Sequence, residues 1–400
     1  MEIQNSSDEV GSKPRHVEIK PWVLYLGTLL QSAGAAMLWP ITTLYMHNTL
    51  HESLTIAGFV LMAVSGAMMV GGYLGGYLFD RWNPFKALII AIVVATATLG
   101  AITLFHQWPL FAILMLVIGL ADGVLYTLLS SYASTIQSID SRRVFNMNYM
   151  FMNVGVVIGT VGVGLLYDYG VTWVFGSAFV LYLIFLILAY FKFKVVGLAK
   201  QAAKAAAKAD RSNFKTPKLV YALLGLTFSI YFGYVLWESV VATHMTDLGL
   251  SIQDYSSLWT INGVVLIIGQ SILNKYAERI KFKTSVIGGG ILFALSFLFL
   301  ITAQTYVAFL GAFMILTVGE MLAAPQIPAW IAKISDPNAQ GHAQGQVMMV
   351  TSFGRALGPL FGGFMIDAAG YKSLFATVFG VMVLFVAISW VSSLRYRIGK

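Results

Sequence analysis

The chain of 400 residues is 58% hydrophobic and 10% charged, has a mean hydropathy of +0.78 and contains no cysteine. A soluble domain of this composition would leave too much apolar surface in water, so the composition excludes one and predicts an all-α integral membrane protein. The lack of cysteine excludes disulfides, thiolate metal sites and cysteine nucleophiles. The net charge of +8 does not indicate a nucleic-acid partner, because basic residues of membrane proteins collect in cytoplasmic loops.

Twelve apolar stretches follow a polar amino-terminal tail. Residues 1–21 lack the apolar core and the small-residue cleavage site of a signal peptide. An even number of spans would place both termini on one side of the membrane. Each apolar stretch is about long enough to cross a bilayer as a helix, and together they predict twelve spans at 22–46, 55–79, 87–105, 109–136, 145–167, 171–191, 219–246, 254–273, 284–303, 306–332, 344–366 and 373–394.

The charges of the loops predict which side holds the termini. All of the 25 basic residues except Arg355 and Lys372 lie in the tails or in loops on the side of the termini. By the positive-inside rule, this side is the cytoplasm. We therefore expect a multi-pass, monomeric protein of the cell membrane, in contact with membrane lipids and with both termini cytoplasmic.

A polar segment at 193–217 divides the chain into two halves. It contains an alanine-rich tract with a lysine at every fourth position, from Lys200 to Lys208. This tract predicts a helix with a basic stripe, which lies either along anionic headgroups or in water as a linker. The predicted organisation is a tail at 1–21, a six-helix bundle at 22–192, the basic linker, a second six-helix bundle at 218–394 and a tail at 395–400.

A frame of three glycines and an aspartate recurs in the two halves. Glycines one helical turn apart open a groove where a neighbouring backbone can approach closely. The recurrence indicates that the bundles are copies of one unit, and parallel repeats of this kind place a substrate site at their interface near the membrane midplane. The frame is repeated 199 residues downstream: Gly155, Gly159, Gly164 and Asp168 correspond to Gly354, Gly358, Gly363 and Asp367.

Two motifs resemble signatures of the major facilitator superfamily. The run Gly76-x-Leu78-x-Asp80-Arg81 resembles the loop between spans two and three, and the run that begins at Gly354 and continues through Pro359 resembles the glycine motif of drug/proton antiporters. The resemblance implies a fold of two six-helix pseudo-repeats, alternating access by rocking of 1–192 against 218–400, and a proton gradient as the energy source in place of a cofactor. It also implies gating by Asp80, Arg81, Gly155, Gly159, Gly354, Gly358 and Pro359.

Four charged side chains lie away from the ends of the predicted spans, and we assign them to proton or substrate coupling: Asp122, Glu238, Glu320 and Arg355. A charge in hydrocarbon costs about 2.5–3.5 kcal/mol to insert, which indicates a functional reason for its presence. Glu320 and Arg355 lie at similar depth on neighbouring spans, and we expect them to form an ion pair that is either structural or a switch for protons or substrate. Asp122 either takes up a proton or cation, or is hydrogen-bonded to a neighbouring helix.

Aromatic side chains accompany Glu238 toward the outer end of the seventh span. They suit an organic cation, although aromatic residues also form belts at the membrane surface. Other polar and aromatic side chains within the spans either line a substrate cavity or bond one helix to another. The candidates for the cavity are Gln31, Trp39, Asn146, Asn153, Tyr231, Tyr234, Trp237 and Asn262.

The sequence contains no phosphate-binding loop and no nucleophile elbow, so it does not indicate an enzyme, and its six scattered histidines lead us to expect no metal site. The first hypothesis is a proton-coupled antiporter that exports lipophilic or cationic small molecules, because the predicted spans hold three carboxylates and no lysine. The alternative is a specific transporter of a sugar, a metabolite or a lipid-linked glycan, bound by asparagines and tryptophans. A sensor or scaffold that transports nothing is a third, disfavoured by the short loops.

Overall fold

The computed structural model describes residues 18–195 and 217–396, and within them leaves out the side chains of Trp39, Pro40, Thr43, Leu44, Asn48, Leu54, Thr55, Asp168 and Ile252. The predicted helix from Lys200 to Lys208 lies outside the described residues. The regular structure of the described residues is helical throughout.

The helices follow one another along the chain with short connections. The first half forms α1 (Pro21–Asn48), α2 (Leu54–Arg81), α3 (Pro84–Leu104), α4 (Leu110–Thr135), α5 (Ser141–Leu166), the short η1 (Tyr167–Tyr169) and α6 (Val171–Lys192). The second half forms α8 (Lys218–Asp247), α9 (Ile252–Tyr276), α10 (Phe282–Leu300), α11 (Tyr306–Ala323), α12 (Gln326–Ile334) and α13 (Gln340–Arg395).

These helices account for the twelve predicted spans. In the described residues, ten helical segments are long and apolar enough to cross a membrane. One of them, α13, contains two spans joined at Gly370, and α1 adds a further helix of 28 residues. The tenth predicted span is divided into α11 and α12 at Ala324 and Pro325. The predicted fold of two six-helix repeats is therefore confirmed.

Local sequence explains where several helices begin. The side chain of Asn83 accepts a hydrogen bond from the backbone amide of Lys86, and Pro84 occupies the first turn, where its missing N–H costs nothing. Ser251 and Asp254 form a reciprocal capping box at the start of α9. These caps satisfy amides that would otherwise lack partners at the edge of the membrane.

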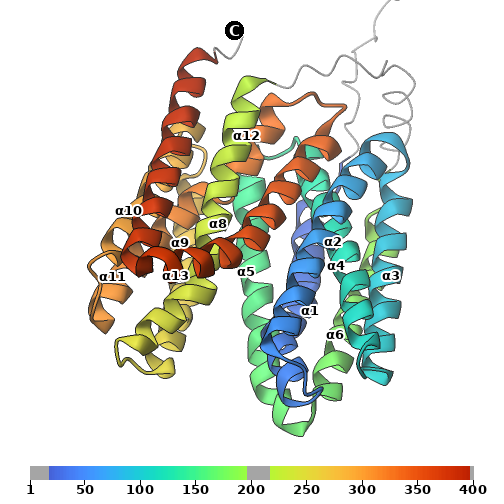
Figure 1. The fold of residues 1–400 in the computed structure, drawn as a ribbon. Helices are drawn as coiled ribbons and strands as arrows, with labels where there is room; N and C mark the ends of the chain where they lie inside the picture. Colours follow the sequence, from blue (N-terminus) through green and yellow to red (C-terminus); the bar gives the residue numbers. More distant parts are fainter. Residues whose placement is uncertain (1–17, 196–216, 397–400) are drawn as a thin grey trace, which may run out of the picture.

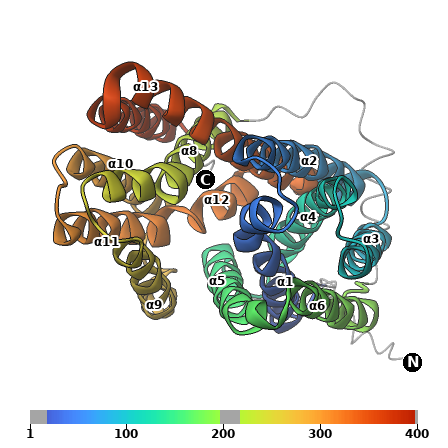
Figure 2. The ribbon, with the colours of Figure 1, turned by 60° about the horizontal axis from the view of Figure 1, so that its bottom comes forward.

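The helices form two bundles, α1 to α6 and α8 to α13, which lie side by side (Figure 1). Within the first bundle α1 packs against α5 and α6, and α2 against α4; within the second, α8 packs against α13, and α10 against α11. The bundles meet where α2 contacts α13 and where α5 contacts α9 and α12. Figure 2 shows α12 between the two bundles.

The recurring glycines lie at equivalent helix contacts in the two bundles. A Cβ added to Gly155 would lie 2.5 Å from the carbonyl oxygen of Leu29 on α1, and a Cβ added to Gly354 would lie 2.8 Å from that of Phe228 on α8. Leu29 and Phe228 are themselves 199 residues apart. Gly159 and Gly358 make the same approach one turn further along, to α1 and α8 respectively. The close approach predicted from glycine spacing is confirmed, and a role in gating stays a prediction.

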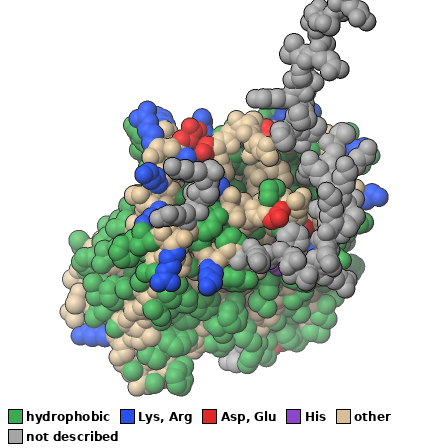
Figure 3. All heavy atoms as spheres, turned by 90° about the horizontal axis from the view of Figure 1, so that it is seen from above, with side chains coloured by type: hydrophobic (Ala, Val, Ile, Leu, Met, Phe, Trp, Pro, Cys, Tyr) green, Lys and Arg blue, Asp and Glu red, His purple; other side chains and the backbone are tan. Residues whose placement is uncertain are grey.

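We call one end of the molecule the terminal face. It is the end at which α1 begins, at Pro21, and α13 ends, at Arg395. Seen from this side, lysine and arginine side chains gather around the helix ends (Figure 3). The connections at this end carry exposed basic residues, among them Lys86 and Lys281. The other end is called the opposite face below.

Candidate functional site

Asp80, at the end of α2, joins the two bundles at the terminal face. Its carboxylate oxygens accept hydrogen bonds from the backbone amides of Gly341 at 2.8 Å and His342 at 2.6 Å, in the first turn of α13. Asp80 is only 8% exposed. A negative charge is favourable at a helix N-terminus because the first amides have no partner within the helix. Arg81, predicted to act with Asp80, lies near His342.

Glycines on both helices make this junction close. A Cβ on Gly345 would lie 2.7 Å from the carbonyl oxygen of Gly72, and Gly76 and Gly341 oppose each other with no room for a Cβ on either. This contact between the bundles was not among the predicted ones. The signal was present as two glycine pairs at four-residue spacing, Gly72 and Gly76 in the second predicted span and Gly341 and Gly345 at the start of the eleventh and just before it.

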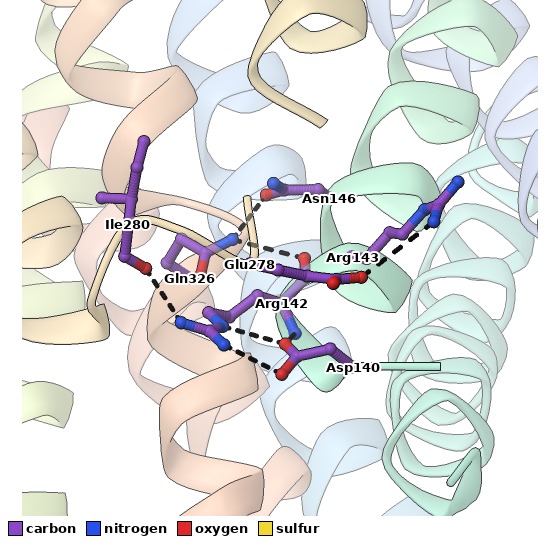
Figure 4. Close-up of polar contacts among 7 residues, drawn as sticks. All are labelled: Asp140, Arg142, Arg143, Asn146, Glu278, Ile280 and Gln326. Carbon is purple, nitrogen blue, oxygen red and sulfur yellow. Dashed lines mark hydrogen bonds and ion pairs between the residues drawn. The ribbon is translucent and has the colours of Figure 1, made fainter. Parts of the chain in front are cut away.

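A second junction at the terminal face is made by the start of α5 (Figure 4). Arg142 makes two hydrogen bonds of 2.9 Å to Asp140 and donates to the carbonyl oxygen of Ile280, in the other bundle, at 3.0 Å. The hydrogen bonds from Arg142 hold the pKa of Asp140 below its ordinary value. Gln326, on α12, donates to Asn146 Oδ1 at 2.6 Å. Asn146 was expected to line the cavity, but it is buried in this bond because α12 packs directly on α5.

Glu320 lies at the interface between the bundles. Tyr149, on α5, donates a hydrogen bond of 2.5 Å to Glu320 Oε1 on α11. Glu320 is buried, and its Oε2 has no hydrogen-bond partner in the described residues. Tyr234 and Asn262 lie close to it. This contact connects a polar side chain of each bundle in the middle of the molecule.

The ion pair predicted between Glu320 and Arg355 is wrong. Arg355 instead pairs with Glu238, Nη2 lying 2.8 Å and 3.1 Å from the two carboxylate oxygens. The reason is that α13 packs along α8, which carries Glu238, whereas α11 packs on α9 and α10, and α12 separates it in the chain from α13. Glu238 is therefore not the free acid that an organic cation would require.

The pair of Glu238 and Arg355 is accessible although both residues lie well within long helices. Their side chains are 33% and 26% exposed. Tyr231 and Tyr234 lie near Arg355 and also near Glu320. The pair, the tyrosines and Glu320 therefore form one cluster at the interface.

Trp237 does not belong to this cluster, and its assignment to the cavity is wrong. Its side chain is fully buried and packs on Phe313, with ring centroids 4.6 Å apart. Asn262 donates to Thr317 Oγ1 at 2.8 Å, between α9 and α11, so its side chain is used in bonding two helices.

Among the remaining cavity candidates, Asn153 donates to the backbone carbonyl of Tyr149 on its own helix. The side chain of Trp39 lies outside the described residues. The rings of Tyr234 and Trp259 are in contact, with their centroids 5.8 Å apart. Tyr231, on α8, lines a small gap between α8 and α4.

A cavity of about 30 Å³ lies between α1, α4, α5 and α12. This volume is comparable with one water molecule, about 30 Å³, and far below the roughly 300 Å³ of a ligand pocket. The cavity is therefore large enough for water but too small for a substrate in this conformation. Its polar lining comes from Thr28, Gln31, Ser32, Tyr126, Ser130, Asn148 and Tyr149.

Asp122 lies apart from the cluster, inside the first bundle. It is buried on α4 and accepts hydrogen bonds from Tyr182 on α6 and, at 3.2 Å, from Gln31 on α1. Of the two roles expected for Asp122, the structure therefore shows the hydrogen bonds to neighbouring helices.

Comparison with known proteins identifies the family. The sequence profile of the Major Facilitator Superfamily matches residues 24–240 and 219–397. The chain belongs to the major facilitator superfamily. The family assignment predicted from two motifs is thus confirmed, and this family member is a membrane transporter rather than an enzyme.

Two bacterial relatives and one solved structure show how far the similarity extends. The chain is 33% identical to the uncharacterized MFS-type transporter YttB of Bacillus subtilis, over 94% of this chain and 96% of the relative. It is 23% identical to multidrug resistance protein 1 of the same species, over 92% and 95% of the two chains. The human organic anion transporter TETRAN has the same fold, with a TM-score of 0.77 at 15% identity over 94% of this chain and 100% of that one.

Proposed function

We propose that this transporter of the major facilitator superfamily exports lipophilic or cationic small molecules in exchange for protons. The observation that carries the proposal is Glu320, a buried acid at the bundle interface that forms no ion pair within the described residues and has one oxygen without a hydrogen-bond partner. An isolated carboxylate charge is costly in a low-dielectric interior, so the acid holds either a proton or a cation. Because both bind the same carboxylate, each displaces the other.

The surroundings of Glu320 support a lipophilic substrate. Tyr234 lies close to the acid and contacts Trp259, which in turn packs on Phe313 at 4.9 Å. Aromatic faces attract organic cations and offer apolar contact to lipophilic ones. A sugar would need convergent hydrogen-bonding side chains, and Asn146 is instead used in bonding the two bundles together. A relative that is named for multidrug resistance is consistent with this preference.

The conformation supports alternating access by rocking of the two bundles. The terminal face, which we assign to the cytoplasm from its basic residues, is closed by Asp80 and Arg142, whereas α5 and α8 diverge toward the opposite face (Figure 1). Opening to the cytoplasm then requires these bonds to break. Protons, a small-molecule substrate and the surrounding lipids are the partners that this cycle needs.

Efflux from proteoliposomes tests the proposal. Vesicles preloaded with a lipophilic cationic dye and given a pH gradient should lose the dye faster when they contain the protein. Glu320→Gln should abolish the acceleration, because an amide keeps the shape of the acid but neither binds nor releases a proton. The matched control is Asp367→Asn, which changes an exposed acid near the opposite face.

Two results would contradict the proposal. One is gradient-driven efflux by Glu320→Gln at the rate of the natural chain. The other is an absence of gradient-driven transport across a broad panel of cations, together with saturable uptake of one neutral solute.

A further inference from the structure

Asp122 is a buried acid that the proposed exchange at Glu320 does not use. It lies in the middle of α4, and both of its hydrogen bonds reach the same oxygen, Oδ1. The donors are the hydroxyl of Tyr182 and the amide of Gln31, which are uncharged. Asp122 forms no ion pair within the described residues.

Among the described residues, the helices around Asp122 bring no positive charge to it. α2 packs on α4 through Gly71 and Gly75. These two glycines lie so close to the carbonyl oxygens of Leu120 and Val124 that a side chain at either position would clash with them. Next to Asp122, a small gap between α1, α2 and α4 is otherwise lined by apolar side chains and Gly119.

The titratable groups that face this region are all tyrosines. Tyr182, on α6, contacts the acid directly. Tyr126, on α4 itself, and Tyr149, on α5, face the water-sized cavity. A carboxylate held only by neutral donors in an apolar surrounding is stable when it carries a proton.

Gln31 connects Asp122 to the interface between the bundles. Its Nε2 donates to Asp122, and its side chain also lines the water-sized cavity. Tyr149, whose hydroxyl donates a hydrogen bond to Glu320, lines the same cavity. Polar groups and space for water thus extend from one buried acid to the other.

From this arrangement we propose that Asp122 is a second proton-binding site, and that Gln31 reports its protonation to the cavity at the bundle interface. The ligand of the site is a proton. The role in transport rests on the proton exchange proposed for Glu320, whereas proton binding by Asp122 does not.

The chemistry of the side-chain amide explains how the signal passes. An ionised carboxylate accepts hydrogen bonds only, so Gln31 presents its NH₂ group to Asp122 and its oxygen away from it. A protonated carboxyl group gains one O–H donor while it still accepts hydrogen bonds. In this proposal the new donor bonds to the amide oxygen of Gln31, and the NH₂ group then turns toward the cavity. The cavity then gains a donor where it had an acceptor, and the hydrogen bonds of water and Tyr149 rearrange accordingly.

Infrared difference spectroscopy of the purified protein, between acid and alkaline pH, tests the proposal without any substrate. The natural chain should show a protonated carboxyl band that is lost in Asp122→Asn and kept in Glu320→Gln and in Asp367→Asn. It should also show a change in a glutamine amide carbonyl band, lost in Gln31→Leu and in Asp122→Asn. Tyr182→Phe, a conservative change, should shift the carboxyl band without removing it.

The outcomes separate the two proposals. A difference spectrum that is unchanged by Asp122→Asn overturns proton binding at Asp122, and an amide signal that persists in Gln31→Leu overturns the role of Gln31. If both signals behave as expected while Glu320→Gln leaves efflux unaffected, the exchange at Glu320 is wrong and the inference about Asp122 stands. If Glu320→Gln abolishes efflux and the Asp122 band is absent, only the inference is wrong.

Discussion

Replacing Asp80 by asparagine should open the terminal face. The carboxylate accepts hydrogen bonds of 2.8 Å and 2.6 Å from Gly341 and His342, and the asparagine side chain offers one acceptor oxygen and no charge. A hydrogen bond to a charged group contributes about 1.5–3 kcal/mol. Because asparagine loses the charge and one of the two hydrogen bonds, we expect the contact between the bundles to weaken by about this amount. At about 1.4 kcal/mol per tenfold, the equilibrium shifts roughly 10- to 150-fold toward conformations in which α2 and α13 separate.

The absence of cysteine makes the assay direct, because labels can be placed without background. Spin labels at Lys86→Cys and Lys281→Cys, one on each bundle, report the separation of the bundles at the terminal face. Asp80→Asn should move the distance distribution to longer values. Glu278→Gln is the control, since its contact with Arg143 is exposed and 4.0 Å long and contributes little. Identical distributions for Asp80→Asn and the natural chain would refute the reasoning.

Two further predictions concern contacts within the bundles. Gly159→Leu should reduce transport while expression survives, because the leucine side chain would enter a backbone contact between α5 and α1; cross-linking that showed both faces opening normally would disprove this. Glu238→Gln and Arg355→Ala should be non-additive in thermal unfolding, because each leaves one charge without its partner and the double change removes both. The coupling should fall below the 3–5 kcal/mol known for fully buried pairs, since the side chains are partly exposed. Additive effects of the Glu238 and Arg355 changes would show that their contact is unimportant.

The spans and the glycine contacts could be predicted because both depend on local information. Hydropathy over about twenty residues places a span, and glycines one turn apart mark a face that can approach a backbone. The recurrence of Gly155 and Gly159 in the second half then predicted equivalent contacts. The structure adds that Leu29 and Phe228, whose carbonyl oxygens these glycines approach, are also separated by 199 residues.

The partners of the membrane charges could not be predicted, because sequence gives the depth of a residue along a span but not the neighbour that its side chain faces. Glu320 and Arg355 share a depth, yet the helix that packs beside Arg355 is α8. The pairing of Glu320 with Arg355 was also based on two continuous spans forming a hairpin. The break at Pro325, between α11 and α12, means that the first of these spans is not continuous.

Helical periodicity could have corrected one error. Tyr231, Tyr234 and Glu238 are spaced by three and four residues and share a face of α8. Trp237 is adjacent to Glu238 and therefore lies about 100° around the helix. It is directed into the interior of its own bundle, where it is fully buried.

The turn at Gly370 is a point at which the movement of α13 can be restrained from the opposite face. Gly370 has a φ of +77°, which L-residues with side chains rarely adopt, and it joins the last two spans with no intervening loop. A movement of α13 away from Asp80 at one end must displace this turn at the other end. Residues next to the turn, including Asp367 and Lys372, are exposed. An antibody fragment that binds this corner should restrain α13 and thereby slow transport, without having to enter the membrane.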